Sequence, residues 1–399
     1  MSRPLIYLIT TAGIPNYGDE LIAMAWLRHL ARERPDADVL VDTVRPSAAA
    51  ETLAGIHPSV RFTSTLWPVA LLSPSWEAAD ISRFAASIVA DPARLAEVEE
   101  RFKLLIRPDG IPWEASPDSV LAGLEDLVSA EVVHMVGGGY LNGIWPVSLG
   151  VTAGVGAALQ RGAGRAVMTG EGIGPYDAGA TDVIRGLIEP FTLVDVRDTV
   201  SAEVAGLAAA QVTCDDVFLD LGPELYATHG KYDVVVNAQA DHGASVEGLT
   251  EFVVSALSRW KVEPGRVAFV ECRPGADDAV YKAVAQSLPE VAFVPVSEVL
   301  ADGLPAGPGV RWISTRFHPH LVAAAAGSPG VAISVQPEYY DAKHSSLIAL
   351  GSGWPMLTTL SDPVGWPEGE GFDQAKLKAL REQKVAVAER VYGTRRASA

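Results

Sequence analysis

Cysteine and histidine are both scarce in this sequence. The only two cysteines, Cys214 and Cys272, form neither a CxxC motif nor a metal-like spacing. This count excludes a disulfide-rich secreted scaffold, and we expect both to be reduced, structural thiols of a cytosolic protein. The eight histidines contain no HExxH motif, and neither a GxSxG elbow nor a Walker A lysine is present. These absences argue against a zinc hydrolase, a serine hydrolase and a P-loop protein, and we expect no metal.

Positive charge and long apolar runs are also lacking. The formal net charge is −18, which argues against a nucleic-acid-binding protein or one that charge holds to an anionic membrane. No apolar run approaches the roughly 18 residues of a membrane span. The run at 5–12 leads into a glycine turn and a helical pattern, so we expect a strand there rather than a signal peptide. We therefore expect a cytoplasmic protein without a transmembrane segment.

Short apolar runs alternate with helical patterns along the whole chain. This alternation predicts α/β domains with parallel sheets and helices on both faces. The runs that we expect to be strands lie at 5–12, 37–44, 131–136, 165–170, 191–198, 211–219, 233–238, 266–271, 291–296, 310–315 and 330–335.

The length of 399 residues suggests more than one domain. A loop-like stretch at 220–233 separates an N-terminal Rossmann-like domain over 1–222 from a C-terminal one over 231–365. A polar-faced helix over 370–399 is expected to pack back on the N-terminal domain. Two such domains would face each other across a cleft at their strand C-terminal ends, where open α/β sheets bind ligands.

The segment "GIPNYGDE" (13–20) follows the first expected strand. Asn16 and Gly18 suit a tight turn, and Asp19 is a good N-cap residue for the following helix. This structural interpretation is complete by itself. The functional alternative puts Asp19 and nearby backbone amides at the floor of the cleft.

Three further strand ends carry glycines or charges. "MVGGGYLNGIWP" (135–146) and "TGEGIGPY" (169–176) run from apolar strands into glycines, which suit either tight packing or a ligand cradle. "VDVRD" places Arg197 and Asp198 at the end of another strand. A surface salt bridge and a position in the cleft both fit that pair.

The segment "STRFHPHLVAAAAGSPGVAIS" (314–334) places Arg316 and His318 before a run of alanines. Pro319 fits the first position of a helix, which favours His318 as its N-cap. Cationic groups here are costly to bury unless an anion binds beside them, and helix amides with an arginine suit phosphate or carboxylate. A structural role is the alternative, and it applies more strongly to His320.

These motifs, in this order, resemble the polysaccharide pyruvyl transferase family over roughly residues 16–350. The matching segments are "NYGDE", "HMVGGGYL", "GEGIGP", "VRDTVSAEV", "DDVFL" and 314–334. The resemblance implies a GT-B-like pair of Rossmann domains, phosphoenolpyruvate as the donor substrate and no cofactor. It also implies a cyclic pyruvate ketal on two hydroxyls of a glycan sugar, with Arg197, Arg316 and His318 on the donor.

The chemistry of the donor agrees with these residues. Phosphoenolpyruvate carries a carboxylate and a phosphate, which two arginines suit better than one. Ketal formation must protonate the enol methylene, and a histidine that titrates near neutrality is an apt proton donor. The candidate residues are His318 and Asp19 for catalysis; Arg197, Arg316, His318, Gly137, Gly138 and Gly172 for the donor; and Asn16, His320 and Lys343 for the acceptor or its loops.

Several features depart from the family pattern. Pro319 and His320 stand where the family has a small residue, and "QPEYYDA" lengthens the path to Lys343. The segment 47–130 carries no family motif and is a candidate acceptor-binding region. A lipid-linked glycan acceptor would bring the cytoplasmic protein to the inner face of the membrane.

Two other functions stay open at this point. One is a GT-B glycosyltransferase that uses a nucleotide sugar, with Glu338 or Asp341 holding the ribose. The other is a non-catalytic protein that binds a phosphorylated metabolite.

Overall fold

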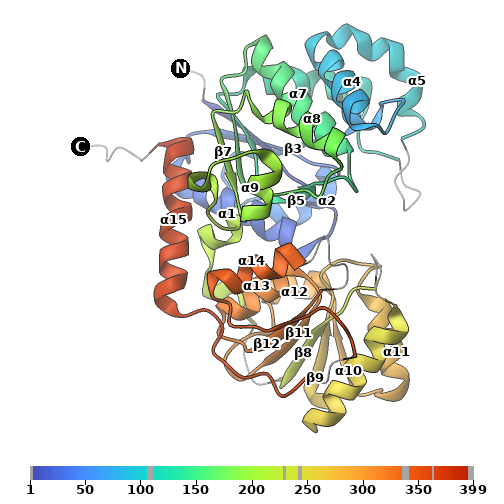
Figure 1. Cartoon of the computed structure of the whole chain (residues 1–399). Coiled ribbons are helices and arrows are strands. Elements are labelled where there is room, and N and C mark those ends of the chain that lie inside the picture. Colours follow the sequence, from blue (N-terminus) through green and yellow to red (C-terminus); the bar gives the residue numbers. More distant parts are fainter. Residues whose placement is uncertain are drawn as a thin grey trace. The chain divides into compact units, whose positions relative to one another are not determined.

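The structure, a computed structural model, describes residues 3–105, 112–227, 231–240, 245–334, 341–361 and 364–393 (Figure 1). The chain divides into two compact units. Unit 1 contains Met1–Ile14, Asp19–Asp220 and Glu382–Ala399, and unit 2 contains Pro15–Gly18 and Leu221–Arg381. Each unit has its own parallel sheet.

The sheet of unit 1 is doubly wound. Its strands are β1 (Leu5–Ile9), β2 (Asp38–Asp42), β3 (Val60–Thr63), β4 (Val132–Met135), β5 (Gly138–Leu141), β6 (Arg165–Ile173) and β7 (Leu193–Val196). Their order is β3-β2-β1-β4-β6-β5, with β7 also paired to β6. The order reverses between β1 and β4, and such a switch point is where open α/β sheets bind ligands.

Strand β6 brings the two glycine-rich segments of unit 1 next to each other. Its first half pairs with β4, and its second half pairs with β5, where Gly138 lies opposite Glu171. The two glycine-rich turns therefore run side by side. A Cβ atom on Gly137 would lie 2.8 Å from the carbonyl oxygen of Gly170, so only glycine permits this close approach.

The helices of unit 1 lie around its sheet or pack on other helices (Figure 1). They are α1 (Tyr17–Glu33), α2 (Pro46–Leu53), α3 (Leu66–Leu71), α4 (Ala78–Ala90), α5 (Glu99–Phe102), α6 (Pro117–Ser129), α7 (Val147–Arg161), α8 (Ala178–Ile188) and α9 (Thr199–Ala205). One apolar core joins them to the strands, and its members include Tyr7, Leu66, Val89, Leu124 and Val155.

Unit 2 also has a doubly wound parallel sheet, with a different order of its last strands. Its strands β8 (Val234–Asn237), β9 (Val267–Val270), β10 (Ala292–Val294), β11 (Arg311–Ser314), β12 (Gly330–Ile333) and β13 (Met356–Leu357) lie in the order β10-β9-β8-β11-β12-β13. Its helices are α10 (Val246–Trp260), α11 (Asp278–Ser287), α12 (Val296–Asp302), α13 (Phe317–Ala325) and α14 (Ala342–Leu350). The switch point of this sheet lies between β8 and β11.

The last helix, α15 (Gln374–Tyr392), belongs to both units, which divide it between Arg381 and Glu382. Its C-terminal half packs on unit 1 through buried residues that include Lys384, Val387 and Val391. The predicted fold class of two Rossmann-like α/β parts, with a C-terminal helix that packs back on the first, is confirmed. The predicted cleft between them stays a prediction.

Some predicted elements differ from the structure. The strand predicted over 211–219 is wrong, because Asp216–Asp220 form a 3₁₀ helix. Strands β3, β5 and β13 were not predicted, since β3 is only partly buried, β5 reads "GGYL" and β13 has two residues. Both cysteines are free and buried. Among the described residues, no helix is long and apolar enough to cross a membrane.

Candidate functional site

The chain of unit 2 turns from β11 into α13 at Arg316. Arg316 is the N-cap residue of α13, so the N-cap predicted at His318 is wrong, and His318 is the second residue of the helix. Pro319 follows at the third position, where a missing N–H breaks no intrahelical bond. The oxygen of the Ser314 side chain accepts a hydrogen bond from Arg316 N (3.2 Å) and thereby fixes the turn.

A buried carboxylate orients the Arg316 side chain. Arg316 Nε lies 2.9 Å from Asp277 Oδ1, and Nη2 lies 2.5 Å from the same oxygen. Asp277 Oδ2 also accepts hydrogen bonds from the backbone N–H of Cys272 (2.8 Å) and from Asn237 Nδ2 (3.1 Å). The Asp277 side chain is fully buried and that of Arg316 is 12% exposed. Arg316 is therefore held in one orientation at the carboxyl ends of β8, β9 and β11.

His318 packs against the short N-terminal segment of unit 2. A Cβ atom at Gly18 would overlap the His318 ring, so only glycine fits there. Asn16 Oδ1 accepts a hydrogen bond from Gly18 N (3.3 Å), and Tyr17 N donates to Cys272 O (2.9 Å). The structure thus brings the predicted residues Asn16, Arg316 and His318 to one region of unit 2.

Two residues with amide side chains lie at and just after the end of β8, next to the turn that leads to Arg316. Asn237 and Gln239 are both fully buried. Gln239 N donates to Thr315 Oγ1 (2.9 Å), which precedes Arg316. Sequence reasoning missed Asn237, Gln239 and Asp277, because single amides and an acidic helix start look like ordinary strand ends and caps.

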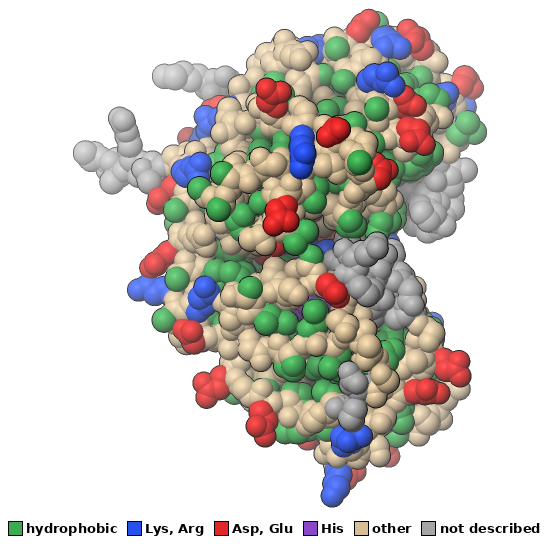
Figure 2. Space-filling view, in the orientation of Figure 1, with side chains coloured by type: hydrophobic (Ala, Val, Ile, Leu, Met, Phe, Trp, Pro, Cys, Tyr) green, Lys and Arg blue, Asp and Glu red, His purple; other side chains and the backbone are tan. Residues whose placement is uncertain are grey.

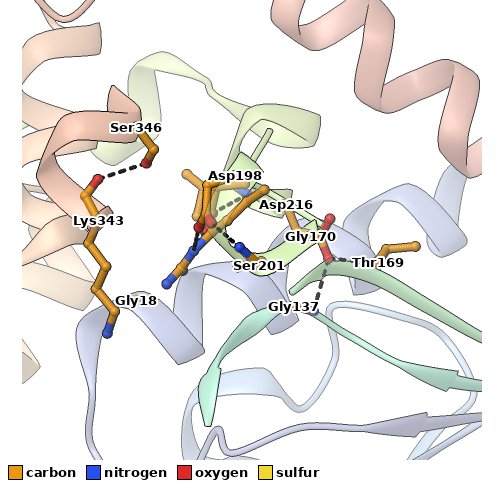
Figure 3. A network of polar contacts seen from close by, with 12 residues as sticks. Gly18, Gly137, Thr169, Gly170, Asp198, Ser201, Asp216, Lys343 and Ser346 are labelled. Atoms are coloured by element: carbon orange, nitrogen blue, oxygen red, sulfur yellow. Dashed lines mark hydrogen bonds and ion pairs between the residues drawn. The ribbon is translucent and has the colours of Figure 1, made fainter. Parts of the chain in front are cut away.

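Arg197 of unit 1 is a buried side chain, only 2% exposed. Its Nη1 lies 3.2 Å from Asp215 Oδ2, and its Nε lies 3.7 Å from Asp198 Oδ2. Asp198 also caps α9, since Oδ1 accepts a hydrogen bond from Ser201 N (2.7 Å; Figure 3). A Cβ atom at Gly172 would overlap the Arg197 guanidinium. Arg197 and Asp198 therefore form a buried ion pair, not the surface salt bridge that the sequence left open.

The amides of the glycine-rich turns bind buried carboxylates. Gly137 N and Thr169 Oγ1 donate to Asp216 Oδ2 at 3.0 and 2.8 Å (Figure 3). Gly170 N donates to Asp195 Oδ2 (3.0 Å). The predicted residue Gly137 thus directs its N–H into the interior of unit 1.

Lys384 of α15 balances the charge of these two carboxylates. Its Nζ lies 2.7 Å from Asp195 Oδ2 and 3.0 Å from Asp216 Oδ1. Burial by itself lowers the pKa of Lys384, but the carboxylates of Asp216 and Asp195 outweigh it and raise the pKa. The pair of aspartates at 215–216 was the only feature of the sequence that pointed to this buried cluster of charges, and such a pair is equally typical of a turn.

Asp19 lies near the first glycine-rich turn, at Gly138. It is inside the first turn of α1, which begins at Tyr17, so its predicted N-cap position is wrong. A Cβ atom at Gly138 would lie 3.5 Å from Asp19 Oδ1. The neighbouring Glu171 is fully buried, and burial raises its pKa well above the usual range. Unit 1 thus groups Asp19 and Gly138 with a carboxyl that sequence reasoning missed.

His320 lies in the interior of unit 2. Its Nδ1 is 3.0 Å from His344 Nδ1, its Nε2 is 2.9 Å from Ser352 Oγ, and its ring stacks on Trp354 at 4.4 Å. Burial, and then the neighbouring His344, hold its pKa well below the usual range. This geometry matches the structural alternative for His320.

The remaining predicted residues lie around α14. The backbone carbonyl of Lys343 accepts a hydrogen bond from Ser346 Oγ (2.7 Å), and Figure 3 shows the extended lysine side chain. Asp341 immediately precedes α14. Glu338 lies outside the described residues.

Several solved structures align with most of this chain at low sequence identity. They include a putative UDP-N-acetylglucosamine 2-epimerase from Listeria monocytogenes (TM-score 0.49, 11% identity, 100% of this chain and 92% of that chain). A UDP-GlcNAc 2-epimerase from Neisseria meningitidis has a TM-score of 0.48 and 12% identity, over 98% and 93% of the two chains. A UDP-glucosyltransferase from Polygonum tinctorium has a TM-score of 0.45 and 11% identity, over 98% and 94%.

No curated protein matches the sequence. The model of the polysaccharide pyruvyl transferase family matches residues 16–271. The match covers more than half of the chain and contains the glycine-rich turns, Arg197 and the end of β9. The chain therefore belongs to the polysaccharide pyruvyl transferase family.

Proposed function

We propose that the protein transfers the enolpyruvyl group of phosphoenolpyruvate onto two hydroxyls of a glycan sugar and forms a cyclic pyruvate ketal. Membership of the family supports a pyruvyl transferase, and the donor and the ketal chemistry are our proposal. The observation that carries it is the pair Arg316 and His318 at the switch point of unit 2, with Asp277 orienting the arginine. An oriented guanidinium suits the carboxylate or phosphate of the donor.

The proposed reaction needs one proton at carbon and one at phosphate. The methylene carbon of the donor takes a proton, and the adjacent carbon gains oxocarbenium character. Two sugar hydroxyls add to that carbon, and its bond to the phosphate oxygen breaks with the electron pair on oxygen. The hydroxyls release two protons, so one balances the methyl group and the other leaves on inorganic phosphate. His318 is the proposed proton carrier, because an imidazole ring can both accept and donate a proton.

Unit 1 supplies the other proposed residues. Arg197, held by Asp215, is the second donor-binding arginine, beside Gly172. Asp19 next to Gly138 is the proposed base that orients or deprotonates an acceptor hydroxyl. This chemistry requires neither a metal nor a cofactor.

Calorimetric titration with phosphoenolpyruvate, and separately with UDP- and GDP-sugars, tests the donor. We expect phosphoenolpyruvate alone to bind the wild type. Arg316→Ala should weaken this binding by about 10- to 100-fold, because hydrogen bonds to charged groups contribute about 1.5–3 kcal/mol. His318→Ala should weaken it less, because that side chain is assigned chiefly to the proton.

Arg266→Ala is the matched control. Arg266 pairs with Asp233 (Nη2 to Oδ1, 2.7 Å) much as Arg316 pairs with Asp277. It lies just before β9, at the amino ends of the strands and so at the opposite edge of the same sheet. This variant should keep the wild-type affinity. Binding of a nucleotide sugar without binding of phosphoenolpyruvate would contradict the proposal.

A further inference from the structure

Gln239 is a fully buried carboxamide whose hydrogen bonds are not satisfied. Its side chain is 0% exposed. Within the described part of the chain, neither Nε2 nor Oε1 has a hydrogen-bond partner. The backbone of Gln239 is nevertheless well held, because its N–H donates to Thr315 Oγ1 (2.9 Å). The unsatisfied groups therefore belong to a fixed position.

Two more unsatisfied polar atoms lie along the same edge of the sheet. Asn237 Oδ1 and Ser334 Oγ are buried, and neither has a partner among the residues that the structure describes. Asn237 ends β8 and Ser334 follows β12, and both of these strands pair with β11, which leads to Arg316. This row of unsatisfied atoms thus lies at the ends of the two strands on either side of β11, at the switch point.

Such a row is unfavourable for folding by itself. Most buried polar side chains in proteins are hydrogen-bonded, and leaving one unsatisfied carries its desolvation penalty. A glutamine at position 239 offers two N–H donors and one carbonyl acceptor. An apolar side chain of the same length would fill the same space without that penalty. A bound ligand that supplies the missing partners would remove this penalty.

The ligand must offer both a hydrogen-bond acceptor and a donor. A carboxylate or a fully ionised phosphate offers acceptors only. A sugar hydroxyl and a monohydrogen phosphate offer both, but only the phosphate also carries the negative charge that Arg316 attracts. Under the proposed function, the phosphate leaves with one of the hydroxyl protons and so becomes this group during the reaction.

We propose that Gln239 binds the departing phosphate group, with Nε2 donating to an ionised oxygen and Oε1 accepting from the new P–OH. Arg316 then supplies the positive charge that attracts the phosphate, while Gln239 recognises whether the phosphate is protonated. The inference rests on the proposed function for its place in the reaction. Because Oε1 gains its partner only as the phosphate is protonated, the interaction favours the leaving group over the bound donor.

Inorganic phosphate and sulfate are the probes that test this inference. At neutral pH both are tetrahedral anions, but only phosphate carries a proton to donate. We expect the full-length wild type to bind phosphate at least about tenfold more tightly than sulfate, as one added hydrogen bond to a charged group implies. Gln239→Met keeps the length of the side chain and removes its polar atoms. It should abolish the preference and raise the Tm of the ligand-free protein.

A second variant and a control complete the experiment. Gln239→Leu repeats the test if the methionine variant does not fold. Gln286→Leu makes the same chemical change on the exposed face of α11 and should retain the preference for phosphate. A preference that persists in the folded position-239 variant, or a wild type that binds phosphate no better than sulfate, would overturn the inference.

Titration with phosphoenolpyruvate separates this result from the proposed function. A preference for phosphate that depends on Gln239, without binding of phosphoenolpyruvate, would support the phosphate subsite and contradict the donor. Binding of phosphoenolpyruvate by the wild type, without a preference for phosphate, would overturn the role of Gln239 and leave the proposed function standing.

Discussion

Side chains of one type take different roles in this protein because their burial and partners differ. His318 stands at the start of α13 against Gly18, whereas His320, two residues later, is sealed in the interior against His344 and Trp354. Glu20 shows the same principle for a carboxyl. Its Oε1 accepts a hydrogen bond from Gly13 N (2.6 Å), but burial dominates and raises its pKa from 4.5 to about 7.

Glu20 should make the protein less stable as the pH rises from 4.5 to about 7. In this window the folded protein holds a proton that the unfolded chain releases, so the free energy of unfolding falls as pH rises. Glu20→Gln is neutral throughout and retains an oxygen acceptor for Gly13. Relative to the wild type, its free energy of unfolding should increase by on the order of 3 kcal/mol across the window.

Urea titrations at pH 4.5 and pH 7.5 measure this difference. Glu247→Gln is the control, because Glu247 occupies the first turn of α10 but is exposed. A constant difference between Glu20→Gln and the wild type at both pH values would show that burial does not hold this proton.

Helix α15 shows how one element can support a site to which it supplies no predicted residue. Its Lys384 compensates Asp195 and Asp216, and these carboxylates bind the backbone of the two glycine-rich turns. Tyr392, at the end of the same helix, places its hydroxyl 2.7 Å from His134 Nδ1. The turns of unit 1 therefore depend on the C-terminal helix.

Lys384→Met should destabilise unit 1 strongly. The change leaves two buried carboxylates without their cation, and removal of one partner of a buried ion pair typically costs about 3–5 kcal/mol. Chemical denaturation followed by circular dichroism gives the loss. Lys378→Met, at an exposed position of the same helix, should change stability by less than about 0.5 kcal/mol. Equal losses in the two variants would be inconsistent with the countercharge role of Lys384.

At the scale of the whole molecule, the acidic charge opposes folding. The net charge of −18 is spread over 399 residues, and Figure 2 shows acidic side chains scattered over the visible surface rather than gathered in one patch. Self-repulsion of this kind acts over distances that salt shortens. The ion pairs at Arg316 and Lys384 are buried and are screened much less.

Added salt should therefore stabilise the protein. Raising NaCl from about 0.01 M to about 0.15 M shortens the Debye length from about 30 Å to about 8 Å. We expect Tm to rise by roughly 2–4 °C, if screening adds about 1 kcal/mol to a unit of this size. Scanning calorimetry in NaCl and in choline chloride separates screening from binding of a particular cation. A fall in Tm in both salts would mean that attractive surface pairs outweigh the repulsion.

The sequence by itself determined the fold class and the order of the site segments. Apolar runs such as 233–238 and 310–315 became β8 and β11 because buried parallel strands need continuous apolar residues. The same reasoning located Arg316, His318 and the glycine-rich turns at strand ends. The same reasoning misplaced the starts of α1 and α13 by one turn or less, because neighbouring polar residues suit the N-cap position equally well.

Only the tertiary structure decided which charges are paired and which polar groups lack partners. Asp277, Gln239 and Lys384 come from distant segments, and nothing in their local sequence indicates that they meet Arg316, Thr315 or Asp216. The local pattern of apolar and polar residues predicts which face of a helix or strand a side chain lies on, because the periods of helices and strands are local. Hydrogen bonding and charge compensation depend on groups that the folded chain brings together across many residues, so these were settled only by the packing of each sheet with its helices.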